Sequence, residues 1–250
     1  MRHFKTPDGT RLAVHEMGDA KDRPLLLLHG LFSSAAMNWV KFGTAAELAG
    51  RGHYLIMPDF RAHGDSDAPE DAGLYPPDVL ASDIEALIEH LELSDYDLGG
   101  YSLGARTVVR LLARGRIPAP GRVILAGMGL AGLTSGGARG EFFLRVIEAT
   151  ERFPAGTAEH AAQAFMRQNN INGAAVAHVL RAQLSTPEAV LAGLTPRTLV
   201  IAGAEDFDNG SAADLATVLP NASHVSIPGN HMSAVTKPDF GTAMGAWLAH

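Results

Sequence analysis

The sequence contains no cysteine among its 250 residues. This absence excludes disulfide bonds and a thiolate nucleophile, and it agrees with a reducing compartment. Basic residues are also in deficit, because 20 Lys and Arg stand against 27 Asp and Glu, for a formal net charge of -7. Nucleic acid needs a basic face that displaces counterions. The composition therefore indicates a protein without a nucleic-acid partner.

Long apolar runs are missing as well. Residues 1–12 contain no apolar segment that could serve as a signal peptide, and runs such as 25–28 are far too short to cross a bilayer. Hydrophobic residues make up 46% and charged residues 19% of the chain, as in ordinary globular proteins. We expect a cytoplasmic protein with one sizeable core and no membrane span. The sequence leaves its oligomeric state open.

Strand-like and helix-like segments alternate along most of the chain. Two short runs flank Pro7-Asp8-Gly9, a turn signal that predicts an N-terminal β-hairpin. Further strands are expected at 24–28, 54–57, 96–100, 122–126, 197–202 and 223–227, and helices at 36–49, 77–93, 211–219 and 233–248, with another ending at 113. This alternation predicts an α/β fold with a mostly parallel sheet of about eight strands and helices on both faces.

One stretch interrupts the alternation. Between Gly127 and Arg197 the pattern changes to helical spacing, in segments 140–153, 157–168, 174–184 and 187–194. For the last segment the sequence predicts Thr186 as N-cap and Pro187 at the first helical position. We predict a small helical cap, residues 130–195, over a core formed by residues 1–129 and 196–250. The glycine-rich stretch 127–140 is the expected hinge.

The candidate nucleophile is Ser102, in the sequence Gly100-Tyr101-Ser102-Leu103-Gly104. This G-x-S-x-G pattern lies where strand 96–100 meets the following helix. Such a tight turn strains the backbone of the serine, and a Cβ at either flanking glycine would collide with neighbouring chain. Because the pattern also arises by chance in glycine-rich chains, its place between a strand and a helix carries the prediction.

A serine hydroxyl needs a base, and the base needs an acceptor for its second nitrogen. Among 11 histidines, His231 follows the last strand after the turn Pro228-Gly229 and is the predicted base. The preceding strand ends in the loop Ala204-Glu205-Asp206-Phe207-Asp208. Asp206 is the predicted acid. Asp208 is the alternative, and it could instead cap the next helix.

In the order Ser, Asp, His, these segments resemble the α/β-hydrolase family, in particular its serine esterase and lipase-like branch with a helical cap. The resemblance extends to His29-Gly30-Leu31-Phe32 and to residues 59–66. It implies the α/β-hydrolase fold and an oxyanion hole formed by the backbone N–H groups of Phe32, with Leu31 as the alternative, and Leu103. It also implies a structural His29 and neither metal nor organic cofactor. By the same resemblance, Asp59, Arg61 and His63 are expected to hold a loop near the site.

The family pattern also excludes some branches. The loop after the first parallel strand lacks the triple glycine of the hormone-sensitive-lipase group. A serine at position 102 excludes the aspartate mechanisms of dehalogenases and epoxide hydrolases. Ala105 stands where many relatives have a second glycine, and it is small enough to fit.

These residues predict a serine hydrolase that cleaves a carboxylic ester of a small or medium apolar substrate through an acyl-enzyme on Ser102. Its expected partner is a small-molecule ester or a related carbonyl compound. Apolar residues expected at the substrate pocket are Leu31, Tyr101, Phe143, Ile147, Phe165, Met166 and Met232. Alternative functions are C–C bond hydrolysis, lyase chemistry, perhydrolase or haloperoxidase-like chemistry, and ligand reception by a weak hydrolase site.

Overall fold

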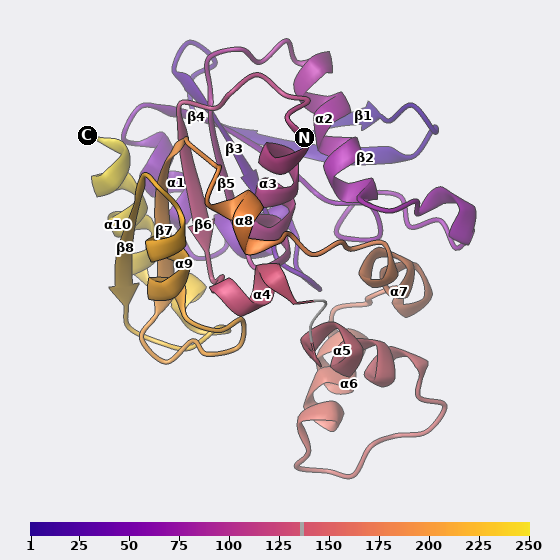
Figure 1. Cartoon of the computed structure of the whole chain (residues 1–250). Helices are drawn as coiled ribbons and strands as arrows, with labels where there is room; N and C mark the ends of the chain where they lie inside the picture. Colours follow the sequence, from indigo (N-terminus) through magenta and orange to yellow (C-terminus); the bar gives the residue numbers. More distant parts are fainter. Residues whose placement is uncertain (136–137) are drawn as a thin grey trace.

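In the computed structural model, which describes residues 1–135 and 138–250, a single mostly parallel sheet crosses the molecule (Figure 1). Its strands are β1 (Arg2–Lys5), β2 (Arg11–Met17), β3 (Arg23–Leu28), β4 (His53–Pro58), β5 (Asp97–Tyr101), β6 (Arg122–Ala126), β7 (Arg197–Gly203) and β8 (Ala222–Ile227). They lie in the order β1-β2-β4-β3-β5-β6-β7-β8. Strand β2 is antiparallel to both of its neighbours, and the pairs from β4 to β8 are parallel. The predicted architecture is therefore confirmed.

Helices cover both faces of the sheet. One face carries α1 (Thr44–Ala49) and α10 (Pro238–Leu248), and the other carries α2 (Val79–His90), α3 (Leu103–Arg114) and α9 (Ala212–Val218). Short turns of other helix types lie at Ala36–Val40, Ala72–Leu74 and Ala234–Thr236. No helix among the described residues is both long enough and apolar enough to span a membrane.

The unbroken apolar run of β3 follows from this two-sided cover. Leu26 and Leu28 join the cluster beneath α2 and α3, whereas Leu25 and Leu27 join the cluster beneath α1 and α10. All four side chains are fully buried. Burying a leucine stabilises a fold by about 1.5–3 kcal/mol, so both faces of this strand contribute to the core.

Between β6 and β7 the described residues form α4 (Leu130–Thr134), α5 (Ala138–Glu148), α6 (Ala158–Gln168), α7 (Gly173–Arg181) and α8 (Glu188–Leu191). Helices α4 and α8 pack against α3, while α5 packs against α6 and α7. Figure 1 shows α5 and α6 standing away from the sheet. Residues 136 and 137 of the predicted hinge lie outside the described residues.

Among the predicted helices whose bounds differ from the structure, two differ for a reason that one residue explains. The helix expected at 36–49 is divided into a short π-type turn and α1, because Gly43 between them adopts a left-handed φ of 86°. The terminal helix begins at Pro238 rather than at 233, since proline has the φ of a first helical residue and needs no hydrogen-bond acceptor there.

The prediction of Thr186 as a helix cap is wrong. Pro187 precedes α8 directly, and the Thr186 hydroxyl accepts a hydrogen bond from Arg110 Nη1 at 3.3 Å. The Thr186 N–H donates to the Leu133 carbonyl at 2.8 Å. Thr186 therefore joins the two ends of the helical segment to each other and to α3.

Two buried histidines lie beneath the loop that follows β3. His29 Nε2 accepts the Phe60 N–H at 3.0 Å, and its Nδ1 lies 2.7 Å from the Gly30 carbonyl. His63 Nδ1 lies 3.0 Å from the Arg61 carbonyl. Both bonds to carbonyls require a proton on Nδ1. Because His29 Nε2 accepts a hydrogen bond, the His29 ring is neutral, and burial favours the neutral form of His63. Burial lowers the pKa of His29 and lowers the pKa of His63 to about 3.

The buried His63 predicts a loss of stability in acid. Its pKa rises from about 3 in the folded protein to the ordinary 6.5 on unfolding, so below pH 6.5 the unfolded chain takes up more protons. Stability is therefore full above that pH and falls as the pH approaches 3. Between pH 7 and pH 5, the free energy of unfolding measured in urea should fall by about 2 kcal/mol more in the wild type than in His63→Asn. The asparagine keeps a hydrogen-bond donor for the Arg61 carbonyl. Equal losses would contradict the prediction.

Candidate active site

Ser102 occupies the single-residue turn between β5 and α3. Its backbone has φ 53° and ψ -108°, a conformation that residues other than glycine rarely adopt. Such a residue costs about 1–3 kcal/mol and persists only where its surroundings fix it. The Ser102 N–H donates to the Ala126 carbonyl at the end of β6, at 2.8 Å. The turn thus holds the serine side chain at the carboxyl edge of the sheet.

The two flanking glycines allow this turn to form. A Cβ at Gly100 would lie 2.3 Å from the Gly104 carbonyl carbon, and a Cβ at Gly104 would lie 2.0 Å from the Leu28 carbonyl oxygen. Real Cβ atoms do not approach backbone atoms so closely. The first turn of α3 can therefore pack against β3 and β5 only with glycine at both positions.

The structure brings Ser102, His231 and Asp206 into one hydrogen-bonded set. Ser102 Oγ lies 3.1 Å from His231 Nε2, and His231 Nδ1 lies 3.1 Å and 3.0 Å from the two carboxylate oxygens of Asp206. His231 and Asp206 are buried, and Ser102 is half-buried. Because the carboxylate can only accept, Nδ1 carries the proton, which leaves Nε2 free to accept from the serine hydroxyl.

The turn around His231 is fixed by its neighbours. The Asn230 side chain accepts the N–H groups of Met232 and Ser233 at 3.1 Å and 3.0 Å. The Tyr101 hydroxyl donates to the His231 carbonyl at 2.5 Å, and the two rings lie 5.4 Å apart. His231 therefore sits in a side-chain-stabilised turn and not at the start of the terminal helix. The role of Asn230 was not predicted, although an asparagine beside the Pro228-Gly229 turn is a signal for such a role.

The loop that carries Asp206 is tied to the end of β8. The Ala204 N–H donates to the Ile227 carbonyl at 2.7 Å, and the Glu205 N–H donates to the Gly229 carbonyl at 3.0 Å. These bonds hold the acid and the histidine side by side. Asp208, the alternative acid, donates its own N–H to Asp206 Oδ1 at 3.3 Å.

Asp208 does not cap the helix that follows. Ser211 is the N-cap of α9, and its hydroxyl accepts the Asp214 N–H at 3.0 Å. The Asp208 carboxylate is paired with Arg139 of α5 at 2.5 Å. No sequence pattern announces this pair, because its partners are 69 residues apart.

The predicted oxyanion donors lie on two elements. Leu103 is the first residue of α3, where helix geometry leaves the N–H without an intrahelical acceptor. Phe32 has a left-handed φ of 57°, and its buried ring meets the ring of Phe143 edge-on at 5.1 Å. The Gly30 N–H in the same loop donates to Asn38 Oδ1 at 3.0 Å.

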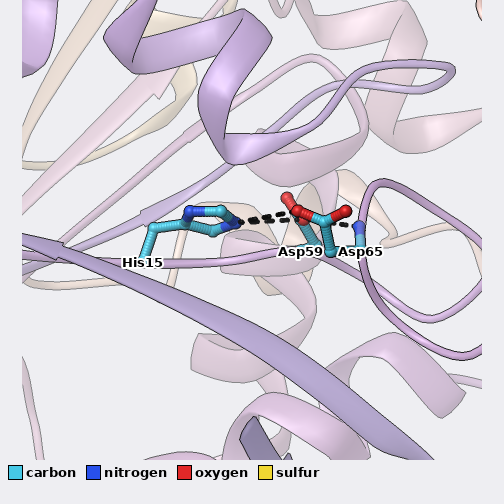
Figure 2. Close-up of side chains that lie close together, drawn as sticks. All are labelled: His15, Asp59 and Asp65. Carbon is cyan, nitrogen blue, oxygen red and sulfur yellow. Dashed lines mark hydrogen bonds and ion pairs between the residues drawn. The ribbon is translucent and has the colours of Figure 1, made fainter. Parts of the chain in front are cut away.

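Asp59 anchors this loop from below. Its carboxylate accepts the Ala35 N–H at 2.6 Å and the Asp65 N–H at 2.9 Å. Figure 2 shows the His15 imidazole pointing toward the same carboxylate, at 3.3 Å. Asp59 thus connects three segments of chain, as expected for a residue that holds a loop near the site.

Two groups in the described part of the chain have the side chains of a metal site. His15, Asp59 and Asp65 form one, and Asp206, Asp208 and His231 form the other, each with ligand atoms within 4.8 Å of one another. Hydrogen bonds between members of each group already explain their close approach. The geometry therefore does not require a metal at either place.

The residues expected at the substrate pocket fall into three groups. Five are half-buried and pack against the cluster that contains Phe32 and Leu103: Leu31, Phe143, Ile147, Phe165 and Met166. Met232 is 61% exposed. Tyr101 is buried in the cluster on the opposite face of the sheet, where it supports the His231 turn. The structure therefore brings five of the seven residues into one cluster, and Tyr101 and Met232 are not part of it.

The fold and the order of Ser102, Asp206 and His231 place the chain in the class of three-layer α/β proteins with a serine at a strand-to-helix turn. Residues 23–170, more than half of the chain, match the model of the alpha/beta hydrolase fold family, so the chain belongs to that family. This match confirms the family predicted from the sequence.

Individual relatives agree with this membership. The AB hydrolase superfamily protein YisY of Bacillus subtilis (strain 168) is 34% identical over 115 residues, which cover 46% of this chain and 40% of that protein. The chain thus matches less than half of the length of this curated relative.

Solved structures cover the whole chain. A hydrolase from Pseudomonas aeruginosa PA01 has a TM-score of 0.79 at 24% identity, covering 100% of this chain and 98% of that one. A thermophilic esterase from Thermogutta terrifontis has a TM-score of 0.78 at 22% identity, with the same coverage. At these identities the likeness shows a shared fold.

The close packing at Gly104 yields a test with a matched control. Gly104→Ala should lower the free energy of unfolding by about 2–3 kcal/mol or prevent folding, because backbone must move to admit the Cβ. Gly140→Ala, in helix α5, meets no atom within 4 Å and should be neutral or stabilising by up to about 1 kcal/mol. Urea denaturation measures both, and equal stabilities of the two variants would refute the packing argument.

Proposed function

We propose that this protein is a serine hydrolase that cleaves a carboxylic ester of a small or medium apolar substrate through an acyl-enzyme on Ser102. The observation that carries the proposal is the unbroken hydrogen-bond path from Ser102 Oγ through His231 to Asp206, with steps of 3.1 Å and 3.0 Å. This is the arrangement that activates a serine hydroxyl.

In the acylation step, His231 Nε2 takes the hydroxyl proton as Ser102 Oγ attacks the ester carbonyl. Asp206 stabilises the imidazolium that forms and keeps its ring oriented. The N–H groups of Leu103 and Phe32 stabilise the negative charge on the carbonyl oxygen. Each such donor contributes about 2.7–4 kcal/mol to the transition state.

The imidazolium then protonates the departing alcohol, which leaves the acyl group on Ser102. In the second step His231 removes a proton from water as the water attacks the acyl carbonyl. The imidazolium then gives this proton to Ser102 Oγ as the acyl–oxygen bond breaks, which releases the acid and restores the serine. The bonds that hold the His231 turn and the Asp206 loop keep the three groups in place through both steps. The same geometry therefore serves acylation and deacylation.

The apolar surroundings support an apolar substrate. Phe143 of α5 lies against Phe32, and Leu31 and Phe165 are half-buried against the same cluster. In this proposal residues 130–195 act as a cap over the site, and some of their apolar side chains contact the substrate. Ile147 and Met166 both lie beside Gly173 at the start of α7, so they also join the cap helices to one another. The fold neighbour from Thermogutta terrifontis, an esterase, agrees with this chemistry.

Hydrolysis of p-nitrophenyl esters from acetate to decanoate tests the proposal. Ser102→Ala and His231→Ala should each lower kcat by about 10⁶-fold and Asp206→Asn by about 10⁴-fold, because each breaks the proton path. His224→Ala is the matched control, since His224 lies exposed on β8 and should be dispensable. Circular dichroism confirms folding of each variant.

The acyl chain length of the ester with the highest kcat/KM would indicate the size of the substrate pocket. A folded wild type without turnover of any ester in the series would overturn the proposal. C–C cleavage, lyase, perhydrolase and ligand-binding assays would then follow.

A further inference from the structure

Helix α5 bridges the two loops on either side of Ser102. Its Arg139 Nη1 lies 2.5 Å from Asp208 on the acid loop. The same guanidinium lies over the ring of Phe143, with 5.2 Å from Cζ to the ring centroid. Phe143 in turn packs against Phe32 on the loop after β3. One helix of the insertion thus contacts both the acid loop and the predicted oxyanion loop.

The charge that Arg139 binds lies beside the proposed base. The carboxylates of Asp208 and Asp206 and a ring nitrogen of His231 all lie within 4.8 Å of one another. Two carboxylates therefore face one imidazole, although only Asp206 is hydrogen-bonded to it. A charge at this distance shifts a protonation equilibrium. The side chains of Asp208 and Arg139 are 42% and 31% exposed, so solvent weakens this influence without removing it.

The other titratable groups around His231 do not neutralise the negative charge of the Asp208 carboxylate. Tyr101 packs beneath the ring, and burial raises the pKa of its phenol beyond the ordinary value, so it stays neutral. Asp206 and Asp208 add to that rise in the pKa of Tyr101, and Arg139 opposes it. Glu205 on the acid loop is exposed, and Lys237 lies beyond the turn that follows His231.

We propose that Arg139 is a charge-balancing residue of the active site: by pairing with Asp208 it keeps a second carboxylate from holding His231 in the protonated form. With this pair formed, Asp206 is the unpaired carboxylate beside His231, and the imidazole is available as a base. Without Arg139, the unpaired Asp208 carboxylate favours the imidazolium, which cannot accept the serine proton. The meaning of this coupling for catalysis rests on the proposed function of Ser102 and His231.

The titration midpoint of the His231 imidazole, followed by NMR, tests this directly. Its resonance is identified by its disappearance in His231→Asn. Arg139→Gln should raise the midpoint by about half a unit, because Asp208 loses its partner. Asp208→Asn should lower it by a similar amount, since Arg139 is then unpaired. The double variant should return close to the wild type.

Arg145→Gln is the matched control. Arg145 also belongs to α5, lies over Phe142 at 5.5 Å and pairs with Glu159 at 2.8 Å, so its loss disturbs the helix equally without changing charge beside His231. The titration midpoint of His231 in Arg145→Gln should equal that of the wild type. Unmoved midpoints in both single variants, or shifts in the same direction, would overturn the inference.

The proposed function is tested separately by labelling Ser102 with a fluorophosphonate. An unlabelled, folded wild type would count against the serine nucleophile. The imidazole titration would still decide whether Arg139 balances Asp208, because it needs no turnover. Where labelling occurs, its rate in Arg139→Gln should fall most below the wild-type midpoint and recover at high pH.

Discussion

The candidate active site depends on how closely the first turn of α3 approaches β3 and β5. Gly100 and Gly104 permit an approach that any side chain would prevent. In that approach Ser102 has a strained backbone with a positive φ of 53°, and the bond from its N–H to the end of β6 helps to hold it there. The strain is local, but the sheet and helix that maintain it form the centre of the fold. The serine is therefore positioned by the core rather than by a flexible loop.

Much of the fold was predictable because its signals are local. Apolar runs bounded by glycine, together with turn residues, mark the strands, and the β6 range 122–126 agrees with the structure. Ser102 and His231 were selected in the same way, each from residues adjacent to it in the chain. Helix bounds were less predictable where one residue overrides periodicity, as Gly43 and Pro238 do.

The rest depends on side-chain direction and on contacts between distant segments. Asp206 and Asp208 share one loop, and only the three-dimensional path shows which carboxylate meets His231. Tyr101 was expected near the substrate, yet it follows the pleat of β5 to the opposite face and binds the His231 turn. The contact of Arg139 with Asp208 has no sequence signal at all. The substrate roles of the remaining apolar residues stay predictions.

The bond between Thr186 and Leu133 has a consequence for how such a protein can diversify. It places the exit of the helical segment directly beside its entry, with both ends resting on α3. The core therefore presents a fixed gap that a peptide of almost any length can close, since closure entropy grows slowly with length. Sequence drift, insertion or exchange between α4 and α8 can therefore change this segment while the sheet continues to hold the serine. The helical segment and the sheet that positions Ser102 can in this sense vary independently.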